Sequence, residues 1–487
     1  MENKNTEILR RIARNAMLEK GLEPDFPQEV LQELSIICEK EPVENISKDL
    51  RHLLWCSIDN HDSRDLDQLS VGEYIDENNT KILVAIADVD SYVKKDSQID
   101  IHASKNTATV YTSAQIFPMI PEKLSTDLTS LGFNEDREAI VFEMIIDKEG
   151  YITHSDIYRA WVHNYAKLDY ISVSKWIDGK EAIPEALAKV KGLDENILLQ
   201  YNTAKKLRLR RNLNGALNFE TKKPRAFVDE NYNLRLSEDE RNKSKEMIED
   251  LMIAVNGISA RFLDNKGFPS VRRVVRTPKR WNRIVELALK QNYTLPEEAN
   301  PKALDEFLIW SKRNNSENFA ELSLSIIKLL GPGEYIIEKP KEDKLGHFGL
   351  AVKDYSHSTA PNRRYPDIIT QRLLKSAMDN KNIPYTEDEL NSLAEHCTFS
   401  ENMIKKVERQ VEKSAFILFL ESKLNHEFKA IVTGENSKGI WVKLLYPPVE
   451  GKLVKKISND LDIGDKIKVR LIDTDVERGF IDFAEVD

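Results

Sequence analysis

Four aspartates lie within nine residues that follow an apolar run of strand length, and this segment restricts the chain more than any other. The run is LLWCSI, residues 53–58, and it is followed by Asp59, Asp62, Asp65 and Asp67. Alternate residues of an extended chain point the same way, so Asp65 and Asp67 can present their carboxylates to one point. Carboxylates so close repel one another unless a cation lies between them, and Mg²⁺ and Mn²⁺ prefer such oxygen ligands. The segment alone leaves two interpretations open, a metal site and an acidic surface loop.

The order of the patterns predicts an α+β protein in three parts. Residues 1–50 contain two short helical segments, which form either a small recognition module or, the favoured interpretation, a lid on the next domain. Residues 51–425 combine apolar strand runs with longer helices and form one large domain. Residues 426–487 contain five short alternating strands separated by Gly, Asn and Asp turns. Five strands in about 60 residues favour a small closed barrel of the OB type.

Two helices are predicted in the second half of the large domain. Residues 237–264 have apolar side chains at helical spacing, and Ser237 with Glu240 predicts a capping box at the start of the helix. Residues 387–424 predict an unusually long helix, with a break expected near Thr398.

Composition allows an RNA-binding protein without demonstrating one. The chain has 487 residues, 41% of them hydrophobic and 31% charged, and a formal net charge of −10. Basic residues are nevertheless concentrated at 205–211 and 272–283, where a solvated helix surface is the simpler explanation. No stretch approaches the ~20 apolar residues that span a bilayer. The start lacks the apolar core of a secretory signal, and the three cysteines have no paired spacing, so we expect a cytoplasmic protein.

Eight separate motifs resemble the catalytic domain of the RNB (ribonuclease II) family. In chain order they are SIDNHDSRDLDQL, VAIADVDSYV, TVYTSAQIFPMIPEKLSTDLTSL, YAKLDY, GALNFET, MIEDLMIAVN, HFGLAVKDYSHSTAPNRRYPDIITQRLLK and KKVERQVE. The resemblance implies a large RNB domain at residues 51–425. It also implies processive, hydrolytic 3′→5′ digestion of single-stranded RNA to nucleoside 5′-monophosphates, with Mg²⁺, or Mn²⁺ in its place, as the cofactor.

The resemblance assigns the catalytic centre to a few charged residues. Asp59, Asp65 and Asp67 take the family's metal-binding and catalytic aspartate positions, and Asp67 is expected to be the most sensitive. Arg363 matches the catalytic arginine, and Arg364 beside it is expected to contact RNA. A guanidinium can bind a phosphate through two parallel hydrogen bonds and offset charge that develops in the transition state.

The remaining matches concern the 3′ end of the RNA. Tyr111 and Phe219 match the aromatic pair that clamps the stacked terminal bases in the family. Tyr170 and Glu249 match positions near the terminal ribose that favour RNA and contribute to catalysis, and Glu408 matches a modulatory glutamate near the centre. A group that bonds the 2′-hydroxyl has no partner in DNA, so DNA is not expected as a substrate.

Two features depart from the family pattern. The aspartate motif normally ends in two adjacent aspartates, whereas this chain has Asp67 followed by Gln68. Gln68 can offer a carbonyl oxygen to a metal but no charge, so weaker Mg²⁺ binding is expected. The first 50 residues also differ from the OB domains that precede the catalytic domain in typical members. RNA anchoring is therefore expected to depend on the C-terminal barrel, where Phe428 and Trp441 are the candidate stacking residues.

Alternatives to an active exoribonuclease remain. Loss of the second aspartate is compatible with a catalytically silent RNA-binding member of the same family. Retention of Asp59, Asp65, Asp67 and Arg363 together argues against that alternative. A DNA or dinucleotide phosphodiesterase is a third possibility, which Tyr170 and Glu249 disfavour. We expect the protein to act as a monomer, because the family's RNA channel lies within one chain.

Overall fold

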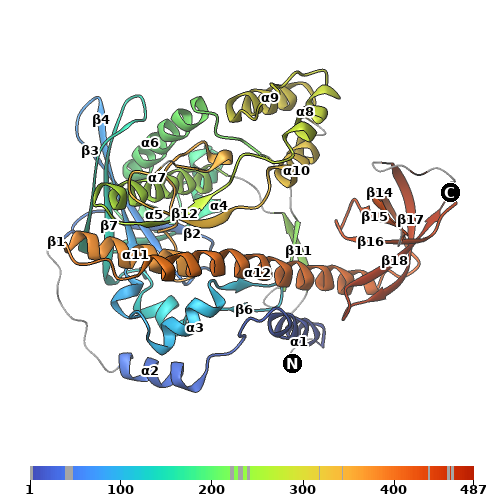
Figure 1. The fold of residues 1–487 in the computed structure, drawn as a ribbon, viewed down its shortest axis with the longest axis horizontal. Helices are drawn as coiled ribbons and strands as arrows, with labels where there is room; N and C mark the ends of the chain where they lie inside the picture. Colours follow the sequence, from blue (N-terminus) through green and yellow to red (C-terminus); the bar gives the residue numbers. More distant parts are fainter. Residues whose placement is uncertain are drawn as a thin grey trace.

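The computed structural model shows an α+β body connected by one long helix to a small β-barrel (Figure 1). It describes residues 4–38, 48–219, 224–228, 234–238, 242–316, 319–342, 344–436, 439–457, 461 and 465–486. None of the helices in these ranges is long and apolar enough to cross a membrane.

A seven-stranded sheet forms the centre of the body. Its strand order is β1-β8-β7-β4-β3-β2-β9. The strands β2 to β4 and β7 to β8 pair in antiparallel fashion, whereas β9 pairs with β2, and β1 with β8, in parallel. Residues 82–87 of β4 are all buried, because β4 lies in the middle of the sheet with both faces covered. The bounds are β1 Lys48–Asp49, β2 Cys56–Asp59, β3 Gln68–Tyr74, β4 Asn79–Ala87, β7 Asp136–Asp147, β8 Ile152–His163 and β9 Ala166–Asp169.

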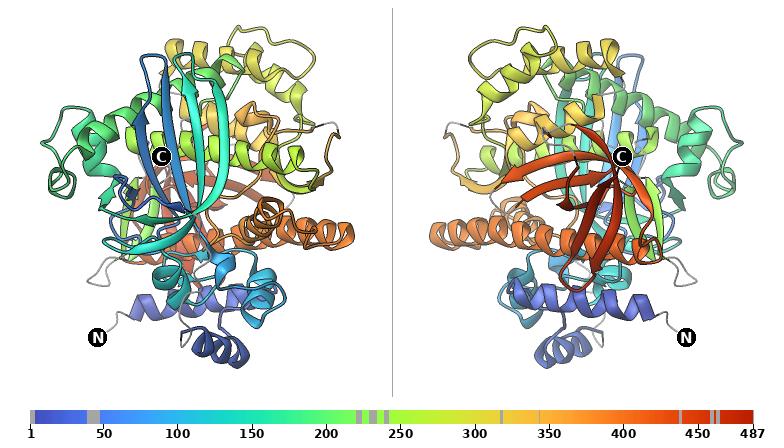
Figure 2. Two further views of the ribbon diagram at one scale, coloured as in Figure 1. Left: turned by 90° about the vertical axis from the view of Figure 1, so that its left-hand side faces the viewer. Right: turned by 90° about the vertical axis from the view of Figure 1, so that its right-hand side faces the viewer.

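Helices cover the sheet and hold the loops that carry the candidate site. Gly72 of β3 lies against α6, where an added Cβ atom would come within 3.2 Å of Leu199. Figure 2 shows the long strands of the sheet above the N-terminal helices. The helices of the body are α3 Gln98–Asn106, α4 Tyr170–Ile177, α5 Glu185–Ala188, α6 Leu193–Leu213, α7 Lys243–Asn265 and α11 Tyr365–Met378. Short pieces are β5 Val110–Tyr111, β6 Ile116–Phe117, β10 Pro224–Val228, β11 Leu234–Glu238, β12 Ser270–Val274, β13 Glu334–Glu338 and the helical turns Val89–Ser91, Leu124–Leu128 and Phe348–Leu350.

Three helices form a separate cluster at the edge of the body. They are α8 Trp281–Leu289, α9 Pro301–Asn314 and α10 Phe319–Leu330. Their apolar faces make a small core of their own around Trp281, Ile284 and Phe307.

The long helix α12, Glu387–Glu421, links the body to the barrel. It begins with a capping box between Thr386 and Glu389. The predicted break near Thr398 is wrong: the helix is continuous over 35 residues. The Thr398 hydroxyl accepts a hydrogen bond from the Tyr335 backbone N–H at 2.8 Å, so this position is held against β13.

The N-terminal helices pack onto the rest of the chain. Helix α1, Lys4–Glu19, lies along α12, and its Leu9 and Ile12 share a core with the barrel. One turn further on, Ala16 and Met17 share a core with Val110 and Phe117 of the β5–β6 hairpin. An ion pair between Arg11 and Glu477 also joins α1 to the barrel. Helix α2, Gln28–Cys38, packs against the body through Val30.

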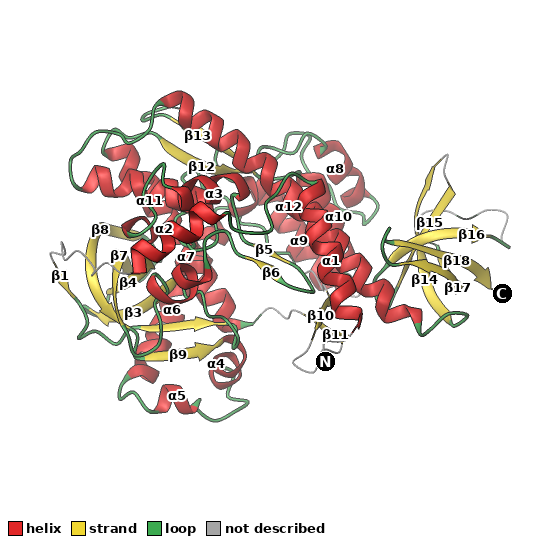
Figure 3. Ribbon diagram, turned by 90° about the horizontal axis from the view of Figure 1, so that it is seen from below, coloured by secondary structure: helices red, strands yellow, loops and turns green. Residues whose placement is uncertain are grey.

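The C-terminal strands close into the predicted five-stranded barrel, which lies apart from the body at the end of α12 (Figure 3). The order around the barrel is β14-β15-β16-β18-β17. Gly451 is required in β16, because a Cβ atom there would lie 2.4 Å from Ile481. The bounds are β14 Glu427–Asn436, β15 Gly439–Leu444, β16 Glu450–Lys455, β17 Lys466–Asp475 and β18 Phe480–Val486.

The start of α7 differs from the prediction. Ser237 lies in strand β11, Glu240 lies outside the described residues, and the helix begins at Lys243. Its N-cap is Asn242, whose side chain accepts a hydrogen bond from the Lys245 N–H. Ser237 and Asn242 are both suitable N-cap residues. Ser237 is paired with β10 as part of strand β11, so the helix is capped by Asn242 instead.

Candidate active site

The acidic loop leaves and re-enters the sheet on neighbouring strands. Asp59 ends β2 and Gln68 begins β3, which lies beside β2. Asp59 accepts hydrogen bonds from its neighbour Asn60 N–H at 2.7 Å and from the Ser63 hydroxyl at 2.8 Å. These contacts turn the loop back at the end of the strand, so its later aspartates face the same end of the sheet.

Asp67 is the most constrained of the aspartates. Its side chain is 2% exposed, and its two oxygens accept hydrogen bonds from the Asn362 N–H at 3.0 Å and the Arg363 Nε at 3.2 Å. Burial raises the pKa of Asp67 to about 7; the nearby Asp65 adds to the rise, and Arg363 opposes it. The metal-free protein therefore binds a proton at Asp67 more tightly than an ordinary aspartate would.

Asp65 connects the loop to the β5–β6 hairpin. The Tyr111 hydroxyl donates a hydrogen bond to Asp65 at 3.1 Å, and the Tyr111 backbone N–H donates one to Glu408 of α12 at 3.3 Å. Tyr111 remains 41% exposed, so part of its ring is open to a ligand. Burial raises the pKa of Asp65, and Arg363 lowers it. Three predicted residues, Asp65, Tyr111 and Glu408, thus meet.

The two arginines of the TAPNRRYPD motif have different surroundings. Arg363 contacts Asp67 while its side chain stays 45% exposed, and its carbonyl accepts a hydrogen bond from the Thr109 N–H of the segment that leads to Tyr111. Arg364 turns inward, where it pairs with the buried Asp367 at 2.8 Å and bonds Thr359 at 3.2 Å. Arg363 thus keeps an exposed part of its guanidinium beside Asp67, whereas Arg364 mainly fixes the loop.

Tyr170 lies next to the acidic loop because of the strand register. Asp59 of β2 pairs with Asp169 of β9, and Tyr170 follows directly at the first position of α4. Burial raises the pKa of the Tyr170 phenol, and the Asp59 carboxylate raises it further. Lys245 of α7 lies 5.8 Å from the centre of the Tyr170 ring. Glu249 is one turn further along α7, with its side chain exposed.

The oxygen atoms of this loop suit a hard divalent cation in kind and in charge. No three His, Cys, Asp or Glu side chains in the described ranges converge closely enough to hold a metal ion. Asp59 raises the pKa of Asp65, and Asp65 raises that of Asp67, so the carboxylates repel one another. A divalent cation would relieve this repulsion. Gln68, at 8% exposed, adds only a neutral amide at the start of β3.

Three further predicted RNA-binding residues belong to other parts of the fold. Phe219 packs against the core of the α8–α10 cluster, and Phe428 is half-buried against the core at the base of the barrel. Trp441 is half-buried on β15, opposite Lys452 of β16.

The sequence did not single out Asn362, Thr129 or Lys245. Asn362 holds Asp67 through its backbone N–H, and its own side chain accepts a hydrogen bond from Thr129 at 2.5 Å. The only signal for Asn362 was its position immediately before Arg363, because a backbone donor carries no residue-type signature.

The two basic runs are largely used within the protein. Arg208 and Arg211 of α6 pair with the buried Asp250 of α7. Arg272 pairs with Glu338 at 3.2 Å, and Arg273 with Glu401 of α12 at 2.6 Å. The expected solvated helix surface is therefore wrong for these arginines. Arg272 and Arg273 lie buried in strand β12, and all four arginines form ion pairs between elements.

Comparison with known families decides the assignment. A family model for the RNB domain matches residues 47–380, more than half of the chain. The chain belongs to the RNB family. A second model, for the RNase II-type exonuclease C-terminal S1 domain, matches residues 426–486. The two family models and the named relatives confirm the expected family, fold class and exoribonuclease class. The RNB family comprises nucleases that depend on a divalent metal ion.

Relatives of known name are longer than this RNB chain. Ribonuclease R of Aquifex aeolicus is 29% identical, with 98% of this chain and 70% of that protein covered. Ribonuclease R 1 of Lactococcus lactis is 27% identical over 94% of this chain, which spans 59% of that protein.

Solved structures share the fold. The structure of Mycoplasma genitalium RNase R in complex with ribose-methylated single-stranded RNA has a TM-score of 0.86 at 22% identity, covering 98% of this chain and 78% of that one. Yeast Ssd1, a pseudonuclease, has a TM-score of 0.67 at 15% identity, covering 92% of this chain and 55% of that one. The fold alone therefore does not guarantee catalysis.

Proposed function

We propose that this protein is a processive 3′→5′ exoribonuclease that hydrolyses single-stranded RNA to nucleoside 5′-monophosphates. The observation that carries the proposal is the contact between buried Asp67 and half-exposed Arg363, beside Asp65 and the open ring of Tyr111. This arrangement joins a carboxylate site for a metal to a guanidinium for the phosphate and an aromatic ring for a base. Named relatives called Ribonuclease R agree with this activity.

Asp59, Asp65, Asp67 and the Gln68 carbonyl would hold Mg²⁺, or Mn²⁺ in its place. A bound ion of this kind supplies polarisation of a phosphoryl oxygen and a lowered pKa for water. Asp67 carries the clearest requirement, because a carboxyl group must be ionised to bind a cation and burial raises the pKa of this one. Arg363 is already hydrogen-bonded to Asp67. A phosphate bound by Arg363 would therefore lie close to the Asp67 carboxylate.

Arg363 and Tyr111 would position the end of the strand. One guanidinium nitrogen of Arg363 bonds Asp67, which leaves the other donors for the oxygens of the scissile phosphate. The Tyr111 ring, fixed by Asp65 and Glu408 at either end, would stack on a terminal base with Phe219 as the second clamp. Such stacking contributes about 1–3 kcal/mol per base and does not depend on sequence.

Tyr170 and Glu249 would select RNA over DNA at the terminal ribose. Both residues would also act beside the catalytic centre. A group that bonds the 2′-hydroxyl loses its partner in DNA. We further propose that Phe428 and Trp441 contact the strand at the barrel, and that the protein works as a monomer in the cytoplasm.

The proposal is tested by incubating 5′-labelled single-stranded RNA, or the matching DNA, with the purified protein and Mg²⁺, Mn²⁺ or EDTA. A metal-dependent ladder that shortens from the 3′ end, on RNA only, is expected. RNA that stays intact under each metal yet is retained in a gel shift would favour the silent RNA-binding alternative, in which Gln68 has weakened the metal site. Equal digestion of DNA would instead indicate a general phosphodiesterase.

A further inference from the structure

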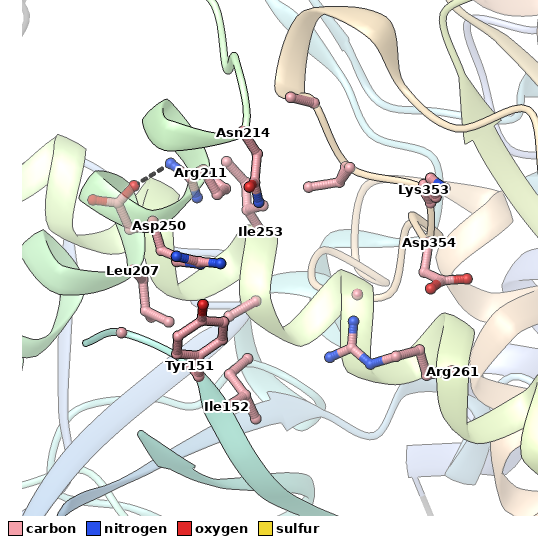
Figure 4. Close-up of a pocket in the computed structure, with 16 residues that line it drawn as sticks. Tyr151, Ile152, Leu207, Arg211, Asn214, Asp250, Ile253, Arg261, Lys353 and Asp354 are labelled. Atoms are coloured by element: carbon pink, nitrogen blue, oxygen red, sulfur yellow. Dashed lines mark hydrogen bonds and ion pairs between the residues drawn. The ribbon is translucent and has the colours of Figure 1, made fainter. Parts of the chain in front are cut away.

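A pocket of about 640 Å³ lies outside the acidic site, beside α7. Its walls come from the β7–β8 hairpin, the end of α6, the middle of α7 and residues 351–354. None of the residues assigned above to the metal, the phosphate or the terminal bases lines it. Figure 4 shows Tyr151, Arg211 and Asp250 on one side of this pocket and Arg261, Lys353 and Asp354 on the other.

Positive charge predominates in the pocket because its two acids are already paired. Asp250 pairs with Arg208 and Arg211. Asp354 pairs with Lys344 at 2.6 Å and with Arg272 at 3.4 Å. These pairs leave the remaining cations of the lining without an acid of their own.

Arg261 is the main uncompensated cation. Among the residues that the structure describes, the side chains of Arg261 and Lys353 make no hydrogen bond and no ion pair, although Asp354 lies near enough to influence the pKa of Arg261. Burial lowers the pKa of Arg261. Gly257 makes room for this side chain, because a Cβ atom at Gly257 would lie 3.1 Å from its Nη1. The guanidinium is therefore held in the pocket with its donors unused.

The opposite wall offers a flat surface and an amide. The guanidinium of Arg210 lies 3.8 Å from the centre of the Tyr151 ring, so the two groups stack. Tyr151 is 46% exposed, and the Asn214 amide points into the pocket from the end of α6. Stacked aromatic and guanidinium planes bind bases, and an amide can bond a base edge.

We propose that this pocket binds a nucleoside phosphate, with the phosphate at Arg261 and Lys353 and the base against Tyr151 and Arg210. The volume lies within the ~300–1,000 Å³ range of small-ligand sites. An unpaired guanidinium can bind a phosphate through two hydrogen bonds. The ligand is either a free mononucleotide or one nucleotide of an RNA strand, which share this chemistry. The proposal does not depend on the catalytic activity of the acidic site.

Equilibrium binding to the full chain in EDTA tests the site. Adenosine 5′-monophosphate and inorganic phosphate are titrated into the wild type, Arg261→Glu and Tyr151→Ala, with Arg283→Glu as the control at an exposed arginine of α8. Arg261→Glu should weaken a phosphate-binding component at least tenfold for both ligands. Tyr151→Ala should weaken only the nucleotide, and Arg283→Glu should change neither. Lys353→Glu, on the same side of the pocket but in the segment 351–354 instead of α7, repeats the test if Arg261→Glu unfolds more easily than the wild type.

A second titration separates the two sources of the ligand. Single-stranded RNA is bound in EDTA by Asp67→Asn, with and without Arg261→Glu. Loss of mononucleotide binding with unchanged RNA affinity indicates a free nucleotide, and a several-fold loss of RNA affinity with a smaller salt dependence indicates a strand nucleotide. The proposal is overturned if Arg261→Glu and Lys353→Glu leave the binding of mononucleotide, phosphate and RNA at the wild-type level.

Discussion

At the scale of single residues, Asp67 is the centre of the candidate active site, where burial and neighbouring charge act together. The sequence alone could place Asp65 and Asp67 on one side of an extended segment, because side chains alternate along such a segment. It could not place Arg363 beside them, since almost three hundred residues separate the two. That contact results from the bridge between Ala108 and Arg364, which brings the arginine loop to the hairpin. Such long-range contacts carry no local signal and entered only through family resemblance.

The raised pKa of Asp67 makes the stability of the metal-free protein depend on pH. A folded-state pKa of about 7 lies above the ordinary value for aspartate, so the folded state binds the proton more tightly than the unfolded chain. The stability from this group is therefore present at acid pH and is lost as pH rises through about 7. In EDTA, the thermal stability of Asp67→Asn should fall less than that of the wild type as the pH rises from acid values to about 7. Parallel pH profiles for the two proteins would contradict the assignment.

Gln68 should limit metal affinity. Replacing it with aspartate adds a carboxylate next to Asp67, so Gln68→Asp should lower the Mg²⁺ concentration for half-maximal activity by about tenfold or more. The same change should destabilise the metal-free protein, because it adds a like charge at a position only 8% exposed. Gln68→Asn, which keeps an uncharged amide, is the matched control. An Mg²⁺ requirement that is unchanged or higher in Gln68→Asp would show that this side chain does not face the metal.

At the scale of elements, local patterns predicted the helices better than their ends. The long helix of residues 387–424 was expected, but its continuity through Thr398 depends on the contact with β13, which the sequence does not show. The start of α7 was placed early because Ser237 and Asn242 are both suitable caps. Alternating strands separated by glycine turns were sufficient to predict the barrel. All of its strand pairs form within the segment 427–486, so the whole pattern is visible locally in the sequence.

The β5–β6 hairpin should carry much of the affinity for the RNA end. Tyr111→Ala removes the exposed ring and should weaken binding of single-stranded RNA by about 1–3 kcal/mol. Tyr111→Phe keeps the ring and loses only the hydrogen bond to Asp65, so it should bind RNA nearly as well as the wild type. Binding by both variants is measured in EDTA to prevent cleavage. An equal loss in the two variants would mean that the hydroxyl, and not stacking, holds the RNA.

Helix α1 should act as part of the folded core. Ile12 is 3% exposed in the core shared with the barrel, so Ile12→Ala should lower the free energy of unfolding by about 2–5 kcal/mol. Leu18, which is 55% exposed on the same helix, provides the control, and Leu18→Ala should change stability by less than about 0.5 kcal/mol. Denaturant unfolding measures both. A silent Ile12→Ala would indicate that α1 is separable from the barrel.

At the scale of the whole molecule, charge totals were a poor guide to where RNA could bind. The chain carries a net charge of −10, and most arginines of its two basic runs form ion pairs that join α6 to α7 and the β12 region to β13 and α12. Two guanidinium groups outside these runs lie at candidate sites: Arg363, which pairs with Asp67 but stays partly exposed, and Arg261 in the pocket beside α7. The distribution of paired and unpaired cations, which only the fold determines, decides where phosphate can bind.

The role of Asp67 in catalysis is tested most directly by comparing the wild type with Asp67→Asn on RNA labelled at its last nucleotide, with Mg²⁺ in a single turnover. We expect the wild type to release the label as a nucleoside 5′-monophosphate. Asp67→Asn should be slower by at least about a hundredfold, with RNA binding retained, because the carboxylate is needed for chemistry more than for affinity. Release of longer fragments by the wild type, or cleavage by Asp67→Asn at the wild-type rate, would contradict these expectations.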